Sequence, residues 1–257
     1  MRVKVALRNL LISQLIIGIF LIFAYFVWFP HSYSTLGGFY KTAFMIVFVD
    51  IILGPLLVFI VYKKDKKYLN FDINVLLGIQ LAAFIYGAYA LYLKHPVYNV
   101  FVENSFKLIN VSFYKPTNTY FENLHNFFYS RPKIAYTELP KDQTERTRFM
   151  IGVDLFGEPD IYQRRDLYQP HYQALNKILD RQLNPTLLFS SNETRTKLNK
   201  FITKYGGDLS DYAFFPISGN NKKEAVFAMN KKNGDAVGII DMSPKLKLAK
   251  LNNTTLD

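Results

Sequence analysis

The sequence predicts a membrane protein in which three N-terminal transmembrane α-helices precede a small α+β extracytoplasmic domain. Half of the 257 residues are hydrophobic, and the long apolar stretches all lie before residue 94. That segment, residues 1–94, holds three of the chain's 20 acidic residues, whereas residues 95–257 have the mixed charge of an ordinary folded domain. These observations exclude a soluble single-domain protein and a disordered chain, and the absence of cysteine excludes a disulfide scaffold.

Three stretches, at residues 10–29, 42–62 and 73–93, are long enough to be transmembrane helices, which need about 20 apolar residues. The first and third carry no charge, and the second carries only Asp50. The first stretch exceeds the apolar core of a secretory signal, and no small-residue cleavage pattern follows it. We therefore interpret it as a retained span.

The basic residues predict the orientation of the spans. Arg2, Lys4 and Arg8 precede the first span, and a Lys-rich loop at residues 63–67 separates the second from the third. The positive-inside rule then places the N-terminus in the cytoplasm and residues 95–257 outside the membrane. Part of the net charge of +11 comes from these basic residues beside the spans, and the rest is dispersed over residues 95–257. We thus expect a lipid bilayer, and no nucleic acid, as a partner.

Asp50 is the most informative residue because a carboxylate inside a membrane is costly and needs a partner. Gly54 lies one turn further on the same face and permits close approach of another helix, while Pro55 predicts a bend. One hypothesis is recognition of a partner helix, or proton or ion handling. The alternative is an internal hydrogen bond, to Gln80 or to a tyrosine, that holds the bundle together.

The third predicted span carries small residues at helical spacing, which is typical of helix–helix packing in membranes. Gly78 with Ala82 forms one such pair, and Ala83, Gly87 and Ala90 form another set. Besides Asp50, the strongly polar side chains inside the spans are Gln14 and Gln80. Together they predict a polar seam, either intramolecular or kept for a client helix.

Residues 95–257 predict strands at both ends and helices between them. The expected strands are 98–102, 106–111, 133–139, 212–217, 224–229 and 236–241, and the expected helices are 141–156, 171–183 and 192–205. Catalytic motifs and clustered metal ligands are absent from the sequence. We therefore expect no enzyme activity, no cofactor and no metal.

Several short motifs occur in order along the chain: VDIILGP at 49–55, Phe71-Asp72 after the Lys-rich loop, Gln80, His95-Pro96-Val97-Tyr98, DLYQPHY at 166–172 and NGDAVGIID at 233–241. In these motifs the chain resembles the TfpX/TfpZ family of type IV pilin accessory proteins, also called fimbrial assembly proteins. His95 stands where the family pattern has arginine, and His171 interrupts a Pro-Tyr pair. We expect Phe71, Asp72, His95, Pro96 and Tyr98 to form a membrane-border motif.

The resemblance implies a non-enzymatic accessory protein, or chaperone, of a Gram-negative inner membrane with a periplasmic domain. Its partner would be a major type IV pilin, met through the pilin's transmembrane helix and periplasmic head. On this hypothesis Asp50, Gln80 and the Gly78/Ala82 pair contact the pilin helix. An envelope sensor and a membrane-bound enzyme subunit remain as alternatives, and the oligomeric state is open.

Overall fold

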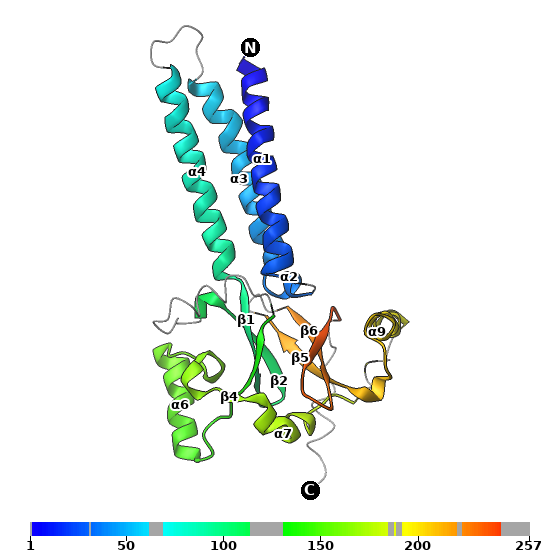
Figure 1. The fold of residues 1–257 in the computed structure, drawn as a ribbon. Coiled ribbons are helices and arrows are strands. Elements are labelled where there is room, and N and C mark those ends of the chain that lie inside the picture. Colours follow the sequence, from blue (N-terminus) through cyan, green and yellow to red (C-terminus); the bar gives the residue numbers. More distant parts are fainter. Residues whose placement is uncertain are drawn as a thin grey trace.

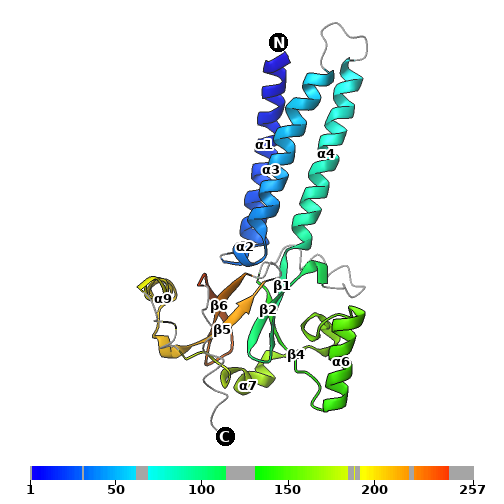
Figure 2. The same cartoon turned by 180° about the vertical axis from the view of Figure 1, so that it is seen from behind.

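The computed structural model describes residues 2–30, 32–61, 69–113, 131–184, 188, 192–219 and 223–242. Three long helices, α1 (Arg2–Val27), α3 (Phe39–Val61) and α4 (Leu69–Leu93), run side by side and stand on a domain built around one sheet (Figure 1). Helix α3 lies between α1 and α4 (Figure 2). The short helix α2 (Tyr33–Leu36) joins α1 to α3. The predicted Lys-rich loop at 63–67 lies outside the described residues.

Two of the long helices have the length and composition of membrane spans: Leu7–Val27 within α1 and Ile73–Leu93 within α4. Only 11% of the α1 stretch and 17% of the α4 stretch is buried. The core helix of a soluble protein would bury most of its apolar side chains, so these two helices resemble membrane spans more closely. The second predicted span, 42–62, is helical as far as Val61 in α3, and its crossing of a membrane stays a prediction.

The domain contains a seven-stranded mixed sheet in the order β4-β3-β1-β2-β5-β6-β7. The strands are β1 (Pro96–Val102), β2 (Ser105–Asn110), β3 (Lys133–Tyr136), β4 (Gln169–Pro170), β5 (Tyr212–Ser218), β6 (Glu224–Asn230) and β7 (Ala236–Ile240). Strands β1 and β2, which correspond to the predicted strands at 98–102 and 106–111, form a hairpin with Val102 opposite Ser105 across a two-residue turn. Strands β5, β6 and β7 form an antiparallel meander, and β2 joins it in parallel to β5.

Helices pack around this sheet and connect its strands. They are α6 (Gln143–Phe156), α7 (Leu175–Leu179) and α9 (Asn192–Tyr205), with 3-10 turns η1 (Val111–Phe113), η2 (Ile161–Gln163), η3 (Arg165–Leu167), η4 (His171–Ala174) and η5 (Leu209–Asp211). Helix α6 begins where the Asp142 side chain accepts a hydrogen bond from the Glu145 amide, and it ends at Gly157, whose φ of 66° is left-handed. The helix predicted at 171–183 is shorter than expected at both ends, because its first turn is 3-10 and α7 ends at Leu179.

The sheet is buried on both faces where β5 and β6 meet. Successive side chains of a strand point to opposite faces, so the neighbours Phe214 and Phe215 enter different cores, and both are fully buried. Phe215 packs with Ile178 of α7, whereas Phe214 packs with Phe201 of α9. Helices thus cover both faces of the sheet, in agreement with the predicted mixture of strands and helices.

Helix α2 is part of one of these cores. Its Leu36 is 1% exposed and lies in the cluster that contains Phe101 of β1 and Phe215 of β5. The Ser32 hydroxyl, just before α2, donates a hydrogen bond to the Ile239 carbonyl of β7 at 2.9 Å. The segment between the first two long helices is therefore built into the sheet domain.

We expect Leu36→Ala to destabilise the sheet domain. Truncating a fully buried leucine leaves a cavity and costs about 2–5 kcal/mol. Thermal unfolding of the full-length protein in detergent would measure the effect, with Leu167→Ala as control because Leu167 is 40% exposed. An unchanged unfolding temperature for Leu36→Ala would contradict the placement of α2 in the core.

Candidate functional site

Asp50 lies on α3 inside the bundle and is 7% exposed. Its Oδ2 accepts hydrogen bonds from Ser13 Oγ at 2.6 Å and Gln14 Nε2 at 2.7 Å, both on α1. Its Oδ1 accepts a hydrogen bond from Gln80 Nε2 on α4 at 2.6 Å. Three neutral donors from two helices thus solvate one carboxylate on the third, as a charge in an apolar bundle requires.

The network extends by one residue and depends on one glycine. Gln80 Oε1 accepts a hydrogen bond from Asn9 Nδ2 of α1 at 3.2 Å, which fixes the orientation of the Gln80 amide. A Cβ added to Gly54 would lie 3.2 Å from Gln80 Nε2. Gly54 therefore leaves room for Gln80 to reach Asp50. Helix α3 continues through Pro55 to Val61, and the Pro55 side chain lies outside the described residues.

The small residues of α4 divide between two faces. A Cβ added to Gly87 would lie 2.8 Å from Ile46 Cγ1 of α3, so the close approach of α3 and α4 occurs there. By contrast, nothing lies within 4 Å of a Cβ built on Gly78, and both Gly78 and Ala82 are exposed. The structure thus brings Asp50, Gly54 and Gln80 together and leaves Gly78 and Ala82 on the outer face.

The predicted membrane-border residues do not form one cluster. Phe71 is 67% exposed near the beginning of α4, and the side chain of its neighbour Asp72 lies outside the described residues. His95, Pro96 and Tyr98 lie beyond the opposite end of α4. Pro96 begins β1, and the Tyr98 ring packs against Tyr168 with ring centroids 5.4 Å apart.

His95 is buried at the junction between the bundle and the sheet, with 1% of its surface exposed. Its imidazole stacks on the Trp28 ring at 6.2 Å and is flanked by the Phe29 and Tyr92 rings. Neither ring nitrogen has a hydrogen-bond partner within the described part of the chain. Burial disfavours the charged imidazolium and lowers the pKa of His95 from 6.5 to about 4.

A hydrogen bond at this junction joins α2 to the sheet. Asn99 Nδ2 of β1 donates a hydrogen bond to the Tyr33 hydroxyl of α2 at 2.7 Å. Asn9, Ser13 and Asn99 were not singled out in the sequence. Asn9 and Ser13 could have been identified as polar residues of α1 at the same depth in the bundle as Asp50. Asn99 could not, because its partner Tyr33 is far away in the sequence.

We also searched the described residues for a metal-binding site. No group of three or more histidine and acidic side chains there is placed to hold a metal ion. The arrangement provides a bundle closed around Asp50, an outer face with small side chains, and a hydrogen-bonded connection between the α2 segment and the sheet.

Three proteins of Dichelobacter nodosus are similar to the chain. "Fimbrial assembly protein, serogroups C1 and C2" is 36% identical over 106 residues, which is 40% of this chain and 78% of that protein. The proteins of serogroups E1 and I are 39% and 38% identical over 88 and 97 residues, and those matches span about a third of each relative, 34% and 36%. No family model and no solved structure matches the chain.

Replacing Asp50 by leucine should destabilise the bundle. Gln14 and Gln80 would then lack their acceptor, and each buried donor without a partner costs about 1–3 kcal/mol. Asp50→Asn keeps an acceptor oxygen and should cost less. Thermal unfolding in detergent compares the two variants, with Val49→Leu as control on the neighbouring outward position. Equal stability of Asp50→Leu and the parent would mean that the network does not hold the bundle.

The junction should weaken in acid through His95. Its pKa is lower in the folded protein than the usual 6.5, so the stability that neutral His95 contributes is complete above pH 6.5 and is lost as the pH falls toward 4. The loss should reach on the order of 3 kcal/mol. Unfolding free energies at pH 7, 5.5 and 4 would be compared with those of His95→Phe, which should lack this part of the pH dependence. If the stability of the parent and of His95→Phe changed equally with pH, the assignment of this pH dependence to His95 would be wrong.

Proposed function

The chain belongs to the fimbrial assembly proteins and takes part in pilus biogenesis, and from this premise we propose that it binds and stabilises a major pilin in the bacterial inner membrane. It would do so before or during assembly of the pilus, as a non-enzymatic chaperone. The names of its relatives support an assembly role.

The proposed topology has three crossings. Helices α1, α3 and α4 lie side by side, and the apolar surface of α1 and α4 is largely exposed. The α2 segment and the sheet domain pack together at one end of the bundle, so both belong on the same side of the membrane. Arg2, Lys4 and Arg8 lie at the other end, which makes that end cytoplasmic and the sheet domain periplasmic.

The outward Gly78–Ala82 face of α4 is the observation that carries the pilin-binding proposal. The bundle uses Asp50 and Gln80 for its own hydrogen bonds, and it uses Gly87 for its own close packing. Gly78 and Ala82 contribute to neither, and small side chains permit close approach of another membrane helix. Helix α4 leads almost directly into β1, so a pilin helix packed on this face would have its head beside the sheet domain.

A single cysteine at position 82 would test this contact, because the natural chain has none. Ala82→Cys, labelled with a benzophenone maleimide in membranes that contain the pilin, should give a pilin adduct on irradiation. The matched control is Ile12→Cys on α1, where Ile12 is 52% exposed. An antibody against the pilin and the mass of the adduct identify the product.

Two results would contradict the proposal. One is the same yield of pilin adduct from positions 82 and 12, which indicates random collision. The other is an unchanged pilin level and normal piliation in a deletion strain, together with no pilin in a pull-down. That second result would favour the envelope-sensor alternative.

A further inference from the structure

Two lysines lie at the end of the bundle that meets the sheet domain. Lys41 is in the first turn of α3, directly before the predicted span 42–62, and Lys94 directly follows the last residue of α4. In the proposed topology both lie at the periplasmic border of the membrane, and the inference below rests on that topology. The basic residues that predict the topology are at the opposite end of the bundle, so Lys41 and Lys94 need another explanation.

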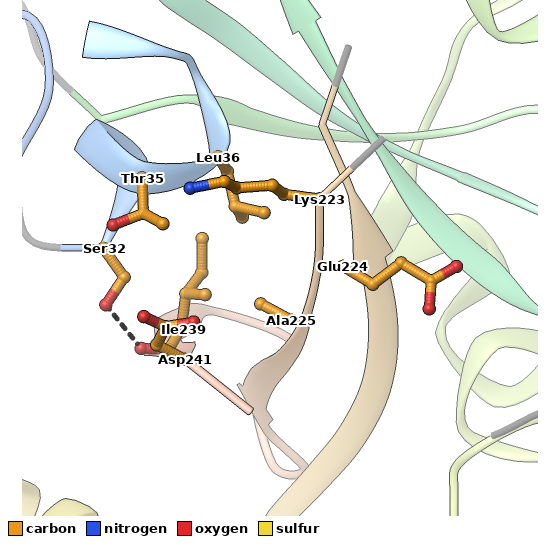
Figure 3. A pocket seen from close by; sticks show the side chains of 8 residues that line it. All are labelled: Ser32, Thr35, Leu36, Lys223, Glu224, Ala225, Ile239 and Asp241. Carbon is orange, nitrogen blue, oxygen red and sulfur yellow. Dashed lines mark hydrogen bonds between the residues drawn. The ribbon is translucent and has the colours of Figure 1, made fainter. Parts of the chain in front are cut away.

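The beginning of α3 is held in place by the segment before it. The Ser32 hydroxyl donates a hydrogen bond to the Ile239 carbonyl, and the Leu36 side chain lies in the same core as Ile239 (Figure 3). Two residues separate α2 from α3. The sheet domain therefore positions the first turn of α3, and with it the backbone of Lys41.

Lys94 is directed toward this turn by a hydrogen bond. Its Nζ donates to Thr42 Oγ1 at 2.6 Å, and Thr42 is the neighbour of Lys41 in the chain. Thr42 is buried, whereas the Lys41 side chain is exposed. An ammonium group has three N–H donors, so the contact with Thr42 leaves Lys94 able to donate to a second acceptor.

The positive charges of the two lysines act on each other. Burial lowers the pKa of Lys94, and repulsion by the charge of Lys41 lowers it further. Neither lysine forms an ion pair with an acidic side chain in the described part of the chain. An anion shared by both ammonium groups would relieve this repulsion and compensate for the water that Lys94 loses on burial.

An apolar stripe runs along α3 from Lys41 toward the middle of the bundle. Phe44, Met45 and Phe48 follow Lys41 at i+3, i+4 and i+7, so they lie on the same face of the helix. All three side chains are exposed, and the Phe44 and Phe48 rings stack with their centroids 5.7 Å apart. This face of α3 thus has a cation at the membrane border and apolar side chains inside the membrane, which is the order of headgroup and acyl chain in a phospholipid.

From this arrangement we infer that the periplasmic ends of α3 and α4 bind an anionic phospholipid of the periplasmic leaflet. Lys41 and Lys94 each donate a hydrogen bond to an oxygen of its phosphate group, and one acyl chain lies along Phe44, Met45 and Phe48. A phosphodiester has two unesterified oxygens, one for each ammonium group. The two lysines therefore act together as one binding site.

The charge of the headgroup should determine which phospholipid binds. Phosphatidylglycerol carries the phosphate and no cation. An ethanolamine or choline headgroup brings its own positive charge close to the two lysines, and this repulsion opposes binding. Phosphatidylglycerol should therefore bind more tightly than phosphatidylethanolamine or phosphatidylcholine with the same acyl chains.

Binding of acyl-labelled fluorescent lipids to the delipidated full-length protein in detergent would test the inference. The parent should prefer phosphatidylglycerol, and Lys41→Gln and Lys94→Gln should each weaken its binding about tenfold, the effect of losing a charge-assisted hydrogen bond. Lys200→Gln, which removes an exposed lysine of α9, is the matched control and should bind as the parent does. Thermal unfolding checks that each variant is folded, and glycerophosphoglycerol and inorganic phosphate serve as soluble competitors.

Three results would overturn the inference. The first is equal binding of the three lipids, and the second is binding by either folded lysine variant that is as tight as that of the parent. The third is displacement by glycerophosphoglycerol or by inorganic phosphate at the lipid's own concentration, which assigns the site to a soluble ester or to a bare anion. Pilin capture by the same variants is measured separately, so failure of lipid binding and failure of the proposed function give different results.

Discussion

The need of one buried carboxylate for hydrogen-bond donors sets the arrangement of the bundle. Asp50 draws Ser13 and Gln14 from α1 and Gln80 from α4, and these contacts fix both the depth and the rotation of each helix relative to α3. Rotating α4 would remove Gln80 from Asp50 and leave the buried Oδ1 without its hydrogen-bond donor. The rotation that satisfies Asp50 is also the one that places Gly87 against Ile46 and leaves Gly78 outside.

The two ends of the bundle are stabilised by opposite means. Near Asp50 both carboxyl oxygens accept hydrogen bonds from side chains of the two neighbouring helices. At the sheet junction His95 is buried among Trp28, Phe29 and Tyr92, and its ring has no hydrogen bond in the described structure, so packing of aromatic rings replaces polar contacts around that side chain. The first arrangement resists loss of register between the helices, and the second makes the junction depend on an uncharged imidazole.

The sequence predicted those elements that depend on residues close together along the chain. Apolar length predicted α1 and α4, and local sequence patterns predicted the strands at 98–102 and 106–111 and the helix at 141–156, which correspond to β1, β2 and α6. The pairing of Asp50 with Gln80 was one of two alternatives. Spacing alone did not tell which small residues of α4 face α3, because the stripes at Gly78 and Gly87 satisfy the same rule. The place of α2 in the sheet core had no local signal, since its partners Phe101 and Phe215 are distant in sequence.

Helix α2 also imposes an order on how the protein comes into existence. Leu36 leaves the ribosome long before Phe215, yet both belong to one core. The hydrophobic interior of the sheet therefore cannot close until the segment between α1 and α3 has arrived beside strands made much later. Residues 95–257 produced alone would present an unfilled cavity to solvent where Leu36 belongs. Correct placement of α2 is thus a condition for maturation of the globular part, because the core of the sheet stays incomplete until Leu36 is in place.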